Sequence, residues 1–262
     1  VEEYKHDTKT EFAELVIPTK DSVRNIFLLR QLLTNGSHVL MVGETGTGKT
    51  VNINTYLQKE MPKEYVPLCL SFSAQTSQNQ TQDIIDSKLE KRKKGVYGPA
   101  AGFHFIIYVD DLNMPQREKY FAQPPLELLR QCISQGGWYD RKTLAFRKII
   151  DKTFVASMGP PGGGRNPISE RIKRYFNIVG YVEMDHESMG IIFETILGNY
   201  LESGDNKKIA ELTKPLVEAT IDIYNNISRE KLPTPAKSHY TFNLRDLAKV
   251  FQGVLMCDLK RT

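Results

Sequence analysis

The stretch that decides the fold is Gly43-Glu44-Thr45-Gly46-Thr47-Gly48-Lys49-Thr50, which fits the pattern G-x-x-x-x-G-K-[ST] at every required position. The apolar run at residues 38–42 predicts a buried strand before it, and residues 49–59 predict a helix after it. This order of strand, glycine-rich turn and helix is the setting in which such a loop binds phosphate. A chance glycine-rich turn is the alternative, and both flanking elements argue against it.

Each residue type in this stretch has a physical role. Glycines allow backbone N–H groups to turn inward around an anion, and the start of a helix adds its dipole and its unpaired donors. The Lys49 ammonium is a mobile charge for the β- and γ-phosphates, and the Thr50 hydroxyl is a ligand for Mg²⁺. We therefore predict that the following residues bind a nucleotide: Gly43, Glu44, Thr45, Gly46, Thr47, Gly48, Lys49 and Thr50.

A second strand carries the acidic residues that such a site needs. Residues 103–109 (FHFIIYV) form the clearest strand pattern of the chain, and Asp110 and Asp111 follow at once. Asp110 is predicted to hold Mg²⁺ together with Thr50, since carboxylate and hydroxyl oxygens suit this ion. For Asp111 two interpretations stay open: it polarises the water that attacks the phosphate, or it is an ordinary residue of a turn at a strand end.

Strand and helix patterns alternate up to about residue 184, and only helical patterns follow. The alternation predicts an α/β fold with a parallel sheet covered by helices on both faces, followed by a small all-helical subdomain. We expect the boundary to separate residues 1–184 from residues 185–262. Strands are expected at 38–42, 66–72, 103–109, 153–158 and 178–182, and helices at 49–59, 76–93, 126–134, 167–176, 186–202, 206–229 and 243–257.

Composition excludes several classes of protein. The 262 residues carry 35 Lys and Arg against 31 Asp and Glu, and the resulting charge of +4 does not suggest a nucleic-acid-coating protein. We interpret the basic run 91–94 as the solvated end of a helix. The three cysteines have no zinc or disulfide spacing, and no apolar run is long enough for a membrane span. We expect a piece of a longer polypeptide that contacts neither nucleic acid nor membrane.

Beyond these motifs, the sequence resembles a known family over roughly residues 14–257. The phosphate loop, the strand ending in two aspartates and the helical C-terminal part resemble an AAA+ module. Four longer stretches resemble dynein heavy chains of the axonemal kind, most closely the third module of the motor ring, with the second or fourth as the alternative. These stretches are DDLNMP (110–115), QPPLELLRQ (123–131), MGPPGGGRNP (158–167) and SHYTFNLRD (238–246).

The resemblance implies roles for residues outside the phosphate loop. Val16, Ile17 and Pro18 lie in the segment that packs over the adenine in this family. Arg245 corresponds to the arginine of the helical lid that reaches the phosphates, although a solvated surface charge is the alternative. Arg171 corresponds to an arginine that projects into the site of the neighbouring module, and a basic surface helix is its alternative.

The chain departs twice from the hydrolytic pattern of the family. Asp111 stands where a glutamate is common, and Gly159 stands where a polar side chain, commonly asparagine, contacts the water or the γ-phosphate. Both changes weaken the positioning of the attacking water, on which much of phosphoryl-transfer catalysis depends. We therefore expect firm binding of ATP or ADP with Mg²⁺ and slow or absent hydrolysis. An actively hydrolysing module and a module of another AAA+ ring machine are the alternatives.

The resemblance also implies a setting. It predicts a cytoplasmic, cytoskeletal protein of the axoneme of a cilium or flagellum, in which this module regulates a minus-end-directed microtubule motor. The expected partners are neighbouring AAA+ modules of the same heavy chain. Dynein intermediate and light chains and microtubules are expected to bind other parts of the full chain.

Overall fold

The structure, a computed structural model, describes residue 12 and residues 15–202, 207–234, 236–237 and 239–257. Contacts divide the chain into two compact units. The sheet unit contains Arg24–Glu44 and Gly48–Val182, and the helical unit contains Glu183–Thr262 together with Val1–Val23 and Thr45–Thr47. Within the described residues, no helix is both long and apolar enough to cross a membrane.

The sheet unit is built on a five-stranded sheet in the order β2-β5-β8-β1-β9, and every pairing in it is parallel. Its strands are β1 (Val39–Val42), β2 (Tyr65–Ser71), β5 (His104–Asp110), β8 (Lys152–Met158) and β9 (Asn177–Gly180). Because parallel strands end at the same edge, the ends of β1, β5 and β8 are brought together, as the pairs Val109–Ala156 and Val42–Met158 show. The predicted parallel sheet is confirmed.

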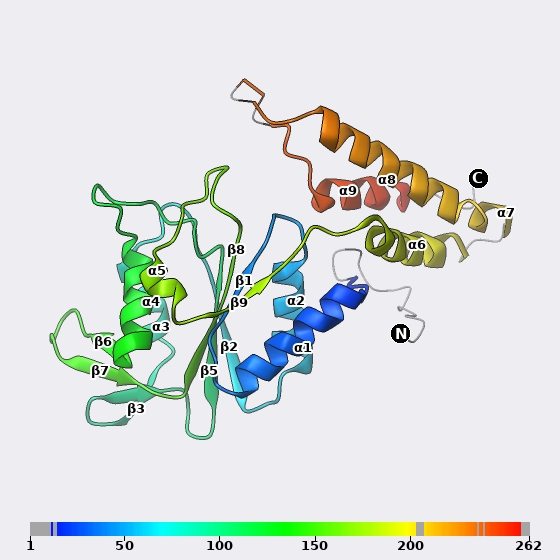
Figure 1. Cartoon of the computed structure of the whole chain (residues 1–262). Helices are drawn as coiled ribbons and strands as arrows, with labels where there is room; N and C mark the ends of the chain where they lie inside the picture. The colour runs from blue at the N-terminus through cyan, green and yellow to red at the C-terminus, as the bar shows by residue number, and fades with distance from the viewer. Residues whose placement is uncertain (1–11, 13–14, 203–206, 235, 238, 258–262) are drawn as a thin grey trace. The chain divides into compact units, whose positions relative to one another are not determined.

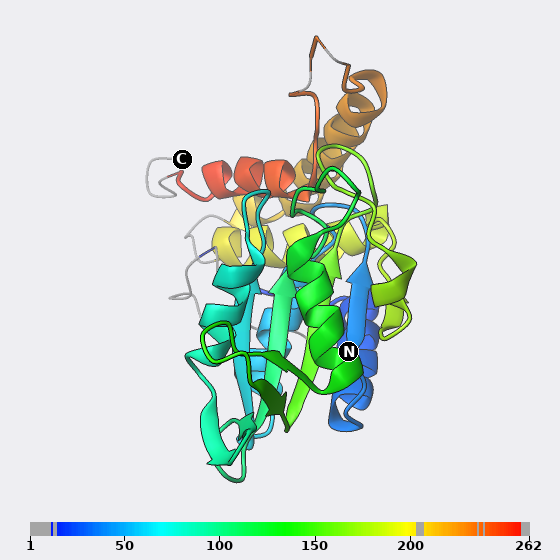
Figure 2. The same cartoon turned by 90° about the vertical axis from the view of Figure 1, so that its left-hand side faces the viewer.

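Helices cover both faces of this sheet (Figures 1 and 2). One face is covered by α1 (Lys20–Thr34) and by α2 (Lys49–Thr55), which continues as the π-helical turn η2 (Tyr56–Glu60). The other is covered by α3 (Gln78–Asp86), α4 (Pro124–Gln135) and the short α5 (Glu170–Lys173). Side chains of β5 alternate between two apolar cores, Ile106 with the first layer and Ile107 with the second, as the period of a strand requires.

A second, four-stranded sheet lies beside α3, in the order β3-β4-β7-β6. Its strands are β3 (Glu90–Lys93), β4 (Val96–Gly98), β6 (Gly137–Tyr139) and β7 (Phe146–Ile149). The helix expected over 76–93 is therefore wrong in its second half, because residues 91–93 pair with β4 instead of extending α3. Gly95 makes the hairpin possible, since its φ of 75° is one that glycine adopts freely. The antiparallel pair β6–β7 forms a hairpin after residue 137.

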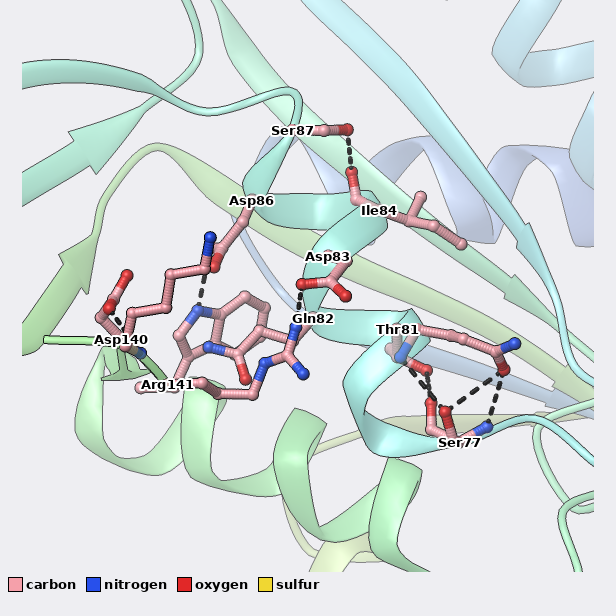
Figure 3. Close-up of polar contacts among 12 residues, drawn as sticks. Ser77, Thr81, Gln82, Asp83, Ile84, Asp86, Ser87, Asp140 and Arg141 are labelled. Carbon is pink, nitrogen blue, oxygen red and sulfur yellow. Dashed lines mark hydrogen bonds and ion pairs between the residues drawn. The ribbon is translucent and has the colours of Figure 1, made fainter. Parts of the chain in front are cut away.

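Polar contacts attach α3 to this second sheet (Figure 3). The buried indole of Trp138 donates from Nε1 to Asp86 Oδ1 at 3.0 Å, and Arg147 Nη1 lies 3.2 Å from Asp86 Oδ2. Burial raises the pKa of the Asp86 carboxyl, while the Trp138 and Arg147 donors oppose that shift. Asp83 and Arg141 point toward one another at the surface and form an ion pair. These contacts fix the edge of the molecule away from the phosphate loop.

The helical unit packs α6 (His186–Glu202), α7 (Lys207–Ala210), α8 (Thr213–Glu230) and α9 (Leu244–Val254) around an apolar core of its own. Phe193 and Phe251 stack at its centre, with ring centroids 4.3 Å apart. Asn243 caps α9 by a reciprocal pair of hydrogen bonds with Asp246, which accounts for the start of that helix. The helical C-terminal subdomain predicted from the sequence is confirmed as a fold.

Candidate nucleotide-binding site

The phosphate loop connects β1 to α2 in the order that the sequence predicts. Gly46 and Gly48 have φ angles of 88° and 82°, a backbone conformation that residues with side chains rarely adopt. Gly43 is needed for a different reason, since a Cβ there would lie 2.6 Å from Cβ of Tyr181. Gly48 is also the N-cap of α2 and has no side chain to bind the first N–H groups of the helix. The loop therefore offers backbone donors at a positive helix end, which suits an anion.

The Lys49 side chain is buried, and its ammonium is held by backbone oxygens of its own loop. Its Nζ donates to the backbone oxygens of Gly43, at 2.8 Å, and of Glu44, at 2.5 Å. Burial lowers the pKa of Lys49, and the positive charge of Arg165 lowers it further, whereas Asp111 and other nearby carboxylates oppose the shift. The two cations at this end of the sheet are thus close enough to disfavour each other. A phosphate placed between them would relieve that repulsion.

Thr50 and Asp110 meet at the start of α2 and the end of β5. The Thr50 hydroxyl lies 3.1 Å from Oδ1 and 3.2 Å from Oδ2 of Asp110. Ser157 on β8 also donates to Asp110 Oδ1, and the Tyr108 hydroxyl lies 3.2 Å from Ser157 Oγ. Burial raises the pKa of the Tyr108 hydroxyl, so this group stays protonated. A hydroxyl and a fixed carboxylate side by side are oxygen ligands that fit Mg²⁺.

The sequence alone gives no indication of the contact between Ser157 and Asp110. The signal that could have found it is the order of the strands. Once β8 is known to lie beside β5, Val109 pairs with Ala156, and Ser157 comes level with Asp110. The order of the strands in the sheet cannot be derived from the local sequence pattern.

Asp111 begins the turn that follows β5. Its φ of 54° lies in the left-handed region, which is unfavourable for a residue with a side chain. Its carboxylate forms an ion pair with Arg165, with 3.5 Å between Arg165 Nη2 and Asp111 Oδ1. The next residue, Leu112, donates its N–H to the backbone oxygen of Ser157, which fixes the turn against the end of β8.

Arg165 occupies the space beside Gly159. A Cβ built on Gly159 would lie 2.6 Å from Arg165 Nε and 2.7 Å from its Cδ, so the arginine stem fills the place of a side chain at the end of β8. A turn closed by two backbone hydrogen bonds between Gly162 and Arg165 carries this residue. The sequence alone gives Arg165 no role. Nothing in it shows that the loop six residues after Gly159 folds back over that glycine.

Asn113 and Asn166 hold the loop after β8 against the loop after β5. Asn113 is fully buried and donates from Nδ2 to the backbone oxygen of Gly159 at 2.8 Å. Its own backbone oxygen accepts the N–H of Asn166 at 3.0 Å, and Asn166 Nδ2 donates to the backbone oxygen of Pro115 at 2.9 Å. The carboxylate of Asp111 and the guanidinium of Arg165 are therefore set on two loops that are tied together.

The remaining predicted residues lie elsewhere. Arg171 is exposed on α5, whose cap Ser169 accepts its backbone N–H at 3.1 Å. Arg245 is exposed in the first turn of α9, and Val16, Ile17 and Pro18 precede α1; these four residues belong to the helical unit. Thr45, Gly46 and Thr47 group with the helical unit as well, whereas Lys49, Thr50, Asp110 and Asp111 belong to the sheet unit. The roles expected for Arg171, Arg245 and residues 16–18 stay predictions.

A parallel sheet with a phosphate loop after β1, an acidic pair after β5 and a separate helical unit defines an AAA+ module of the P-loop NTPase class. Comparison with known families specifies the class further. The P-loop containing dynein motor region matches residues 4–184, and the AAA+ lid domain matches residues 216–261. The chain belongs to the dynein motor-region family, which is a family of P-loop ATPases.

Curated relatives agree with this assignment. The chain is 54% identical over 261 residues to dynein axonemal heavy chain 1 of Homo sapiens, covering 95% of this chain and 6% of that relative. It is 45% identical over 256 residues to human dynein axonemal heavy chain 3 and 44% identical over 256 residues to human dynein axonemal heavy chain 6. These matches cover 98% and 97% of this chain, and 6% of either relative. The resemblance to axonemal dynein heavy chains is therefore confirmed, and it concerns a small part of their length.

Proposed function

We propose that this chain is a nucleotide-binding module of an axonemal dynein motor ring that binds ATP or ADP with Mg²⁺. The observation that carries the proposal is the meeting of three groups at one end of the sheet. Lys49 lies over the phosphate loop, and the Thr50 hydroxyl lies 3.1 Å from Asp110. The cation suits the phosphates, and the two oxygen ligands suit Mg²⁺, which would neutralise phosphate charge when bound.

We further propose that hydrolysis in this module is slow or absent. Asp111 has a shorter side chain than glutamate and is paired with Arg165, and Gly159 offers no polar group to a water molecule. Neither residue is part of the phosphate loop. The module would then hold a nucleotide and regulate its ring through differential affinity for two conformations.

The other predicted roles complete this proposal. Residues 1–184 would form the nucleotide-binding subdomain and residues 185–262 the lid. Arg245 would reach the phosphates from the lid, Val16–Pro18 would pack over the adenine, and Arg171 would serve the neighbouring module. By resemblance the chain is the third module of its ring, in a minus-end-directed microtubule motor of an axoneme.

The deciding experiment measures occupancy and turnover on the same protein. The 262-residue chain is purified, its retained nucleotide is identified after denaturation, and its binding of ATP and ADP is measured with and without Mg²⁺. We expect one nucleotide per chain, Mg²⁺-dependent affinity and turnover near zero. Thr50→Val keeps the side-chain shape and should lose the Mg²⁺-dependent part of the affinity. Absence of binding would overturn the proposed function, and steady turnover would overturn only its second part.

A further inference from the structure

Arg165 is placed as a charge facing the phosphate site, and its surroundings do not satisfy it. Within the described part of the chain, its Nε is buried and has no hydrogen-bond partner, while its Nη2 reaches only 3.5 Å from Asp111 Oδ1. The side chain as a whole is partly exposed, but a buried N–H that lacks a partner is costly unless an acceptor completes its bonding. The planar fork of arginine is suited to the oxygens of a phosphate group.

The charges around Arg165 point to the same ligand. Lys49 is the nearby cation, and it is held over the phosphate loop by the backbone oxygens of Gly43 and Glu44. The repulsion between Arg165 and Lys49 contributes to the lowered pKa of Lys49, and Asp110, Asp111 and Glu44 are the carboxylates that oppose it. Asp110 is already engaged by Thr50 and Ser157, so Asp111 is the carboxylate left to pair with Arg165.

The stem and the backbone of Arg165 are held in place by their neighbours, unlike those of a flexible surface arginine. The stem of Arg165 is packed on Gly159, its backbone is closed in a turn with Gly162, and Asn166 beside it is bound by Asn113. Only the end of the side chain is free to change partner. The stem of the side chain thus fills the space beside Gly159 at the end of β8.

We propose that Arg165 is the residue by which this site distinguishes a nucleoside triphosphate from a diphosphate, on condition that the site binds nucleotide as proposed above. In the absence of a terminal phosphate the guanidinium pairs with Asp111. With a triphosphate bound it leaves Asp111 and binds the terminal phosphate. Asp111 is then a competing anion, and the two residues form a switch that responds to the nucleotide state.

The test compares affinities for ATP, for its β,γ-imido analogue and for ADP by titration calorimetry on the 262-residue chain. In Arg165→Gln we expect the affinity for both triphosphates to fall about tenfold or more, and the affinity for ADP to change less than about twofold. Arg165→Lys keeps the charge but lacks the planar fork, so its affinity for the triphosphates should lie between those of the unmodified chain and Arg165→Gln. Arg130→Gln removes another arginine of the sheet unit, one that pairs with Glu127 on α4, and should leave the ratio unchanged.

For Asp111→Asn we expect the opposite change in triphosphate affinity from that in Arg165→Gln. Removal of the competing carboxylate should tighten triphosphate binding a few fold and leave ADP binding unchanged, and this gain should vanish in the double variant with Arg165→Gln. If Arg165 only supports the loop, both single variants weaken ATP and ADP together, and the proposal fails while the nucleotide site stands. If the unmodified chain binds neither nucleotide, the proposed function fails and the role of Arg165 fails with it.

Discussion

The ends of β1 and β8 lie next to each other in one sheet, yet they follow the pattern of the family to different degrees. After β1 the chain keeps every position of the phosphate loop, Lys49 donates to the backbone oxygen of Gly43, and the Thr50 hydroxyl lies 3.1 Å from Asp110 Oδ1. After β8 the chain has Gly159, and an arginine from a later turn lies over it. The difference leads to the proposal that holding a phosphate and activating a water are separable properties, carried by neighbouring strand ends.

The largest effect should come from the part that keeps the pattern. Lys49→Ala removes the buried ammonium over the loop, and we expect the affinity for both ATP and ADP to fall by about 100-fold, or ~3 kcal/mol, as for a lost charged hydrogen-bonding group. Titration calorimetry measures this. Lys148→Ala removes an exposed lysine of β7 and serves as the control with unchanged affinity. Tight ATP binding by Lys49→Ala would show that the loop is not the phosphate site.

A smaller effect, on stability, is expected at Gly159, where the chain departs from the family pattern. Gly159→Asn adds the polar side chain that the family resemblance leads us to expect here, but its Cβ would lie 2.6 Å from Arg165 Nε. We expect the free energy of unfolding to fall by about 2 kcal/mol, because overfilling a packed site forces backbone and side-chain shifts. Chemical denaturation measures this change. The double variant Gly159→Asn with Arg165→Ala should recover most of the loss, and its failure to do so would mean that the two residues do not compete for space.

Sequence reasoning was most successful where one continuous stretch carries the chemistry. The phosphate loop and the strand before Asp110 follow from local patterns, and the family resemblance placed them in one fold. It failed at the second half of α3, where pairing of β3 with β4 outweighed the local helical spacing. It also missed Ser157 and Arg165, whose roles depend on strand order and on a loop that folds back. Tertiary placement of this kind is absent from local sequence.

Ser157 on β8 allows a test of the contact between the ends of β5 and β8. Ser157→Ala removes a donor from the Asp110 carboxylate and a partner of the Tyr108 hydroxyl. We expect a loss of about 1 kcal/mol in unfolding free energy, and a few-fold weaker dependence of nucleotide affinity on Mg²⁺, because a less firmly held carboxylate is a poorer ligand. Thermal unfolding and titrations with and without Mg²⁺ check both. An unchanged Mg²⁺ dependence would exclude Ser157 from the ion site.

The smallest effect is expected at Asp111, which follows β5, and a small effect there would separate phosphate binding from the activation of water. In a hydrolysing module, the acidic residue after β5 positions the attacking water, and its loss lowers the rate by orders of magnitude. Here the carboxylate is paired with Arg165 and stands in a left-handed backbone conformation. Since no water-positioning partner stands at Gly159, Asp111→Asn should change steady-state turnover by less than about twofold. The rate is measured by phosphate release, with Lys49→Ala as the background. A large drop in Asp111→Asn would show that the end of β5 still activates water, and that binding and hydrolysis are not separated in this module.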